Sequence, residues 1–104
     1  MDKFKEIKAT FRVKSTTGVY DYKFVIERKH SACFKYGDQS CHILKIYDFE
    51  DNKFLRDDYY DTRYDHLDTE KEIWVKVWTR YIEKNWTLYP IVTLLDYEER
   101  EVTL

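Results

Sequence analysis

The feature that most constrains this chain is an alternation of apolar and polar residues near its start. From Ile7 to Val13 every second residue is apolar, and from Tyr20 to Ile26 apolar residues again recur at every second position. A period of two is typical of a β-strand that buries one face and exposes the other. The segment between the two runs, residues 15–18, is short, polar and ends in a glycine. The two runs therefore predict an antiparallel hairpin.

The register of this hairpin follows from the requirement that both apolar faces coincide, because a slip of one residue would turn one face outward. Thr16 and Thr17 are poor residues for a two-residue turn, which favours a longer loop. The pairs that we expect are Val13 with Tyr20, Phe11 with Tyr22, Ala9 with Phe24, and Ile7 with Ile26.

A second hairpin is predicted in the middle of the chain. Residues 41–49 and 53–60 read as strands on either side of residues 50–52, where Asp and Asn favour a turn. Each pair that we expect would be favourable between neighbouring strands. These pairs are Phe49 with Phe54, Lys45 with Asp58, and Leu44 with Tyr59.

An amphipathic helix is predicted over about residues 69–85. Thr69, followed three residues later by Glu72, matches a capping box at its start. At helical spacing one face is apolar and the opposite face is polar. The apolar face holds Trp74, Val77, Trp78, Tyr81 and Ile82, and the polar face holds Glu72, Lys76, Thr79 and Glu83. The many β-branched residues leave a strand as the alternative.

The expected fold is a single compact domain of the α+β class over residues 1–104, a length that suits one core. Residues 88–95 predict a strand in which Pro90 marks a sheet edge or a strand start, and residues 101–104 predict a short further one. The two N-terminal hairpins would then form a small antiparallel sheet. The helix would pack on that sheet, completed by one or two C-terminal strands.

The chain has the features of a cytoplasmic protein. Residues 1–8 mix charged and apolar residues and contain no apolar run that could serve as a signal-peptide core. No apolar run approaches the roughly 20 residues of a membrane-spanning helix. With two cysteines among 104 residues, the chain lacks a disulfide framework. We therefore expect free thiols, and no membrane partner.

Charge is unevenly distributed along the chain, although the net charge is only −2. Residues 1–47 hold ten Lys and Arg against five acidic residues, whereas residues 48–72 hold four basic residues against ten acidic ones. If the fold separates these segments, one face would be acidic and would attract a basic partner. The alternative is that the charges interleave in space and serve solubility alone.

The acidic region includes a segment rich in aspartate and tyrosine, residues 57–68. Tyrosine is enriched at protein interfaces because its ring is apolar and its hydroxyl forms hydrogen bonds. Interspersed aspartates would complement a basic surface, so this segment is our candidate partner-binding site. Its predicted contact residues are Asp57, Asp58, Tyr59, Tyr60, Asp61, Tyr64 and Asp65. The structural alternative is an ordinary solvated strand end and loop.

A metal site is a weaker candidate. His30, Cys33, Cys41 and His42 are residue types that bind zinc, but their spacing does not match a zinc motif, and adjacent strand residues point to opposite faces. We therefore expect no metal or other cofactor. Asp65 and His66 could form an acid–base pair, but no catalytic motif accompanies them. The sequence thus gives little support for an enzymatic function.

In character the chain is similar to small acidic inhibitors of bacteria and phages, such as immunity proteins and nuclease antagonists, although no motif carries this resemblance. It implies a protein-binding module that presents nucleic-acid-like charge to a basic partner. Direct nucleic-acid binding is disfavoured by a pI near 5.9. Two other classes remain open: a small metal-dependent enzyme or zinc-stabilised domain using the His/Cys cluster, and a structural or self-assembling component.

Overall fold

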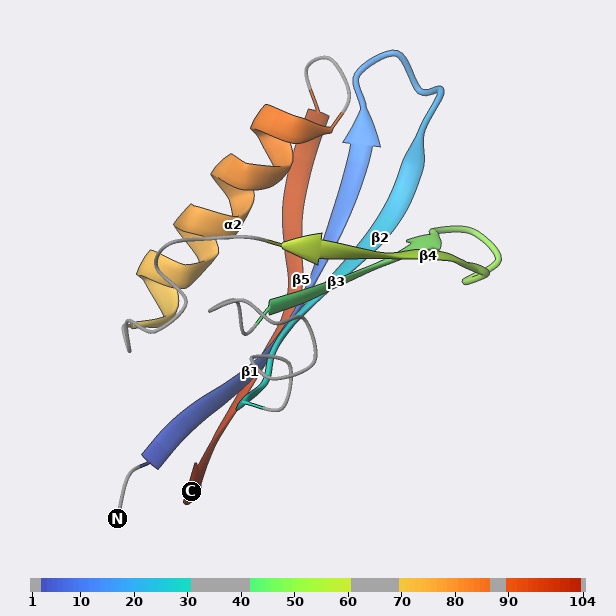
Figure 1. Cartoon of the computed structure of the whole chain (residues 1–104). Helices are drawn as coiled ribbons and strands as arrows, with labels where there is room; N and C mark the ends of the chain where they lie inside the picture. Colours follow the sequence, from blue (N-terminus) through green and yellow to red (C-terminus); the bar gives the residue numbers. More distant parts are fainter. Residues whose placement is uncertain (1–2, 31–41, 61–69, 87–89, 104) are drawn as a thin grey trace.

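Within the part of the chain that the structure describes, five antiparallel strands form one sheet, and one helix packs on one face of it (Figure 1). The computed structural model describes residues 3–30, 42–60, 70–86 and 90–103. The elements are β1 (Lys3–Ser15), β2 (Asp21–Arg28), β3 (His42–Asp48), β4 (Phe54–Tyr60), α2 (Lys71–Asn85) and β5 (Pro90–Thr103). The strand order β4-β3-β2-β1-β5 makes β4 and β5 the two edges. This arrangement is the small α+β fold expected from the sequence.

The core lies between the helix and the apolar faces of the three central strands. Its buried apolar residues are Ile7, Ala9, Phe11, Val13, Phe24, Ile26, Leu44, Ile46, Trp74, Trp78 and Ile82. On β1 these are the odd positions and on β2 the even ones, so the two predicted apolar faces do coincide. The alternation in the sequence thus reports which face of the sheet the helix covers.

The predicted register of the β1–β2 hairpin is wrong by two residues. Phe11 pairs with Phe24 rather than with Tyr22, and Ile7 pairs with Arg28. The loop is longer than a two-residue turn: the Ser15 N–H donates to the Tyr20 carbonyl at 3.0 Å, and Gly18 adopts a positive φ of 77°. A shift of two residues keeps the same side chains on the same face, which is why the faces are right although the pairs are not.

The predicted register of the β3–β4 hairpin is also wrong. Leu44 pairs with Asp58 and Lys45 with Asp57, one residue from the expected partners. Nearer the turn Tyr47 pairs with Phe54, which leaves Leu55 as the extra residue of a β-bulge. Phe49, expected to face Phe54, instead lies in the turn, where its N–H donates to the Asp21 carbonyl at 3.1 Å.

Residues 71–85 are a helix, so the strand alternative is excluded. The expected capping box is wrong, because Glu70 is the N-cap residue and its side chain makes no capping hydrogen bond; Thr69 lies outside the described residues. Trp74, Trp78 and Ile82 are buried as the periodicity predicts, and Val77 and Tyr81 pack against the same core. Burial of this stripe outweighs the β propensity of the individual residues.

The C-terminal strand is longer than expected. Instead of a strand ending near residue 95 and a separate short one, β5 is continuous and pairs with β1 from Pro90 to Thr103. Leu95 is the extra residue of a second β-bulge. Pro90 begins β5 at the sheet edge, as predicted, where its missing N–H breaks no central hydrogen-bond ladder. Among the described elements no helix is both long and apolar enough to cross a membrane.

Two isoleucines of α2 test how far the helix depends on its buried face. Ile82 is fully buried, whereas Ile73 is 49% exposed. We expect Ile82→Ala to lower the free energy of unfolding by about 2–5 kcal/mol through lost burial and a cavity. Ile73→Ala should change it by about 0.5 kcal/mol or less. Urea denaturation of both variants measures the difference, and equal losses would contradict this packing.

Candidate functional site

Part of the predicted partner-binding segment belongs to the edge strand β4. Asp57 is exposed and lies opposite Lys45, whose pKa is raised chiefly by a hydrogen bond to Glu27 and further by the charge of Asp57. Asp58, Tyr59 and Tyr60 complete the backbone of β4 opposite Leu44, Ile43 and His42. Asp61, Tyr64 and Asp65 lie outside the described residues, and so does His66. The described part of the segment thus starts at a sheet edge.

The two described members of the His/Cys cluster contact aromatic rings. His42 is fully buried, with its ring 5.2 Å from that of Trp74 and 5.5 Å from that of Trp78. The ring of His30 lies 5.4 Å from that of Phe4. Cys33 and Cys41 lie outside the described residues. Within the described ranges no three His, Cys, Asp or Glu side chains are grouped to hold a metal ion.

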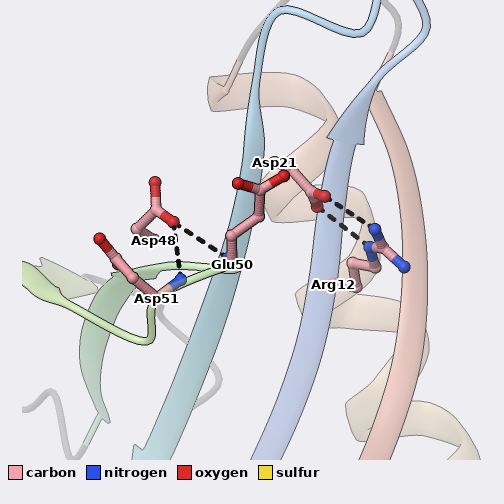
Figure 2. Close-up of polar contacts among 5 residues, drawn as sticks. All are labelled: Arg12, Asp21, Asp48, Glu50 and Asp51. Carbon is pink, nitrogen blue, oxygen red and sulfur yellow. Dashed lines mark hydrogen bonds and ion pairs between the residues drawn. The ribbon is translucent and has the colours of Figure 1, made fainter.

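The basic and aromatic residues of the first hairpin do not share one face. Tyr22 and Phe24 pack with the core under the helix, whereas Lys23 and Arg12 lie at the alternate positions of their strands, on the other face. Arg12 is bound to Asp21 through two hydrogen bonds of 2.7 and 3.0 Å (Figure 2). These residues therefore do not form the basic aromatic platform that stacks nucleic-acid bases.

An open aromatic hollow of about 340 Å³ lies on the helix-bearing face of the sheet. It is lined by Tyr20, Tyr22, Phe24, Ile46, Leu55, Arg56 and Trp86. Phe24 and Ile46 also belong to the core, and Trp86 is the residue that follows the last turn of α2. The hollow thus begins where the helix stops covering the sheet.

Ring contacts shape this aromatic hollow. Tyr20, Tyr22 and Phe24 recur at every second position, and their ring centroids are 5.8 and 6.3 Å apart in succession. The ring of Trp86 meets Phe24 edge-on at 5.3 Å, and the Arg56 guanidinium lies 4.7 Å from the Trp86 ring centroid. Such contacts hold flat apolar surfaces in a fixed arrangement. The hollow can therefore receive an apolar or aromatic group.

Sequence reasoning did not find the aromatic hollow. The alternation identified Tyr22 and Phe24 as part of an inward face, but not which part of that face the helix would leave open. Leu55 lines the hollow as the extra residue of the bulge, and no pattern in the sequence marks that position. The signal in the sequence that could have pointed to it is the run of aromatic residues at positions 20, 22 and 24.

Acidic residues lie in the turn that precedes β4. The Asp48 Oδ1 atom accepts hydrogen bonds from the N–H groups of Glu50 at 3.0 Å and Asp51 at 3.3 Å (Figure 2). The side chains of Glu50 and Asp51 are exposed. Residues 48–58 together hold five acidic residues against two basic ones, Lys53 and Arg56. Carboxylates therefore precede and follow the part of β4 that lines the aromatic hollow.

On the face of the sheet opposite α2, Glu27 is a buried carboxylate among the described residues. Glu27 is 7% exposed and forms ion pairs with Lys29 at 2.9 Å and with Lys45 at 3.1 Å. Burial alone would raise the pKa of Glu27, but the hydrogen bonds and charges of the two ammonium groups together outweigh burial and hold the pKa below its ordinary value of 4.5. This arrangement is a structural ion-pair network rather than an acid–base pair.

Comparison with protein families, with curated proteins and with solved structures finds no match to this chain. What this protein does must therefore be inferred from the geometry of its described residues and from the chemistry of its sequence.

Because the pKa of Glu27 is depressed in the folded state, the stability of the fold should depend on pH. A carboxyl whose pKa is lower in the folded state stabilises the fold above its unfolded pKa, and this stabilisation is lost as pH falls. We expect wild-type stability, measured by urea denaturation, to decline between about pH 5 and pH 3 more steeply than that of Glu27→Gln. Glu98→Gln, an exposed control on β5, should keep the wild-type slope. Parallel curves for wild type and Glu27→Gln would contradict the proposed role of this network.

Proposed function

We propose that this chain is a protein-binding module that engages a basic partner surface through the Asp/Tyr segment, residues 57–68. The observation that supports this proposal most directly is the position of β4 at the sheet edge, with its first four residues exposed. Phe54 and Leu55 are 50% and 44% exposed, and Asp57 follows them. Exposed apolar side chains beside carboxylates are typical of a surface that recognises another protein.

One form of this function is inhibition. A row of carboxylates can imitate the charge of nucleic-acid phosphates and occupy a basic nucleic-acid site on another protein. Asp57, Asp58, Asp61 and Asp65 would supply the charge, and Tyr59, Tyr60 and Tyr64 would supply apolar anchors. The proposal places the protein in a cytoplasm, in a role of the bacterial or phage immunity type, with Cys33 and Cys41 as thiols.

A charge reversal tests the acidic segment against the rest of the surface. Asp58→Lys with Asp61→Lys should weaken binding of a fluorescent oligolysine peptide at least about tenfold at low salt, and should flatten the salt dependence of binding. Asp96→Lys with Glu98→Lys on β5 makes the same change in net charge and should weaken binding less. Fluorescence anisotropy measures both affinities, and circular dichroism checks that each variant is folded.

The two double variants separate local from global electrostatics. Equal losses in both would show that only net charge matters, and unchanged affinity in the Asp58/Asp61 variant would remove the segment as the binding site.

A further inference from the structure

Strand β5 presents the longest strand edge that the described residues leave unpaired. It runs from Pro90 to Thr103 and pairs on one side with β1, and no described strand lies on its other side (Figure 1). An open edge presents a row of N–H and C=O groups that can form hydrogen bonds with a further strand. The residues along this edge indicate which strand fits it.

The two halves of the β5 edge differ in character. Residues 91–95 are Ile-Val-Thr-Leu-Leu, and Ile91 and Leu95 are 53% and 48% exposed. Residues 96–101 hold four acidic residues against one basic residue. Like charges directly opposite each other destabilise a strand pair. An antiparallel strand of the same sequence therefore fits the apolar half, whereas alignment of two acidic halves would set carboxylates against each other.

We propose that two copies of this chain pair antiparallel through residues 91–95 of β5, about a two-fold axis at Thr93, and join their sheets into one. This inference concerns the edge opposite β4, so it goes beyond the proposed function and does not depend on it. A two-fold axis makes each contact between unlike residues occur twice, which doubles the effect of every favourable pair.

The side chains of this stretch complement one another across the axis. Val92 would lie opposite Leu94 of the second copy, and Ile91 opposite Leu95 of the second copy. Val92 and Leu94 both pack against the core on the helix-bearing face. An open groove of about 430 Å³ beside α2 has Leu94 in its lining, so Val92 of the second copy would lie next to this groove. Pairing thus extends the apolar face from one copy to the other.

Two exposed charges outside the apolar stretch also match across the axis. Lys14 and Asp96 lie on the sheet face opposite α2, and neither forms an ion pair within the described residues. Lys14 lies beside Ile91, so it is level with Leu95 of the second copy and one residue from Asp96 of the second copy. Two strand spacings, about 10 Å, separate their backbones, a span that the lysine and aspartate side chains can bridge together.

The same two residues are too far apart to pair within one copy. Asp96 lies opposite Thr10, which is four residues from Lys14 along β1. Four residues of a strand span about 14 Å. The pair of Lys14 with Asp96 therefore reports contact between copies, and a dimer contains two such pairs.

Charge also argues against pairing through β4. An antiparallel alignment of two β4 strands about Arg56, Asp57 or Asp58 sets two like charges directly opposite each other at the axis. At the β5 edge, the bulge at Leu95 ends the regular stretch that begins at Pro90. The contact is therefore short and uses one edge of each copy, so the assembly closes at a dimer.

Two threonine variants on β5 test the dimer. Thr93→Lys sets two ammonium groups opposite each other at the axis, whereas Thr103→Lys makes the same change outside the paired stretch. Both threonines are exposed, and each lies beside a basic residue of β1, Arg12 or Lys3. Sedimentation velocity over about a hundredfold range of concentration should show wild type and Thr103→Lys reaching twice the 12.9 kDa mass of one chain. The dissociation constant of Thr93→Lys should be at least about fivefold higher.

Charge reversals test the alignment of the two copies. Lys14→Asp and Asp96→Lys each set two repulsive pairs across the axis, so each variant alone should dimerise about tenfold more weakly than wild type. In an equimolar mixture the two variants form a heterodimer in which both pairs are again attractive. The mixture should therefore recover most of the wild-type affinity, and circular dichroism checks that each variant is folded.

Each of the other results overturns the proposal. A monomer at every concentration shows that a second copy does not occupy the β5 edge. A dimer that Thr93→Lys leaves as stable as wild type forms through a different surface. If the mixture of Lys14→Asp and Asp96→Lys associates no better than either variant alone, the copies do not align about Thr93.

Discussion

The packing of two tryptophans against the sheet holds this molecule together. Trp74 and Trp78 are stacked with ring centroids 5.2 Å apart, and both are almost fully buried against the apolar faces of β1, β2 and β3. Among the described residues they are the largest fully buried side chains, and the ring of His42 meets both of them edge-on. Because the helix is fixed by this contact, the position of its last turn also decides where the sheet face opens and the aromatic hollow begins.

Periodicity predicted which residues point inward, but local hydrogen bonds decided which residues pair. The alternation from Ile7 to Val13 and the stripe through Trp74 and Trp78 report burial, which depends on side chains that the sequence shows directly. The register depends instead on loop geometry, such as the bond from Ser15 to Tyr20 and the turn around Asp48. Each such loop sequence can adopt several turn conformations, and the surrounding strands determine which of them forms.

The candidate site was predictable in its chemistry and not in its geometry. Carboxylates and tyrosines crowd residues 57–68, and the structure places the beginning of this segment on an edge strand. The neighbouring hollow combines residues from β2, β3, β4 and the end of α2, which lie far apart in the sequence. Such a site arises from the relative placement of elements, and a linear pattern does not encode that placement.

Both outer strands carry an irregularity at a leucine, Leu55 in β4 and Leu95 in β5. A flat, regular edge strand can pair with the same edge strand of another copy, and repeated pairing of this kind builds fibrils. A one-residue insertion disturbs the even spacing of peptide groups that such growth requires. The molecule can therefore keep apolar side chains on its edge strands, because the backbone of these strands is a poor template for polymerisation.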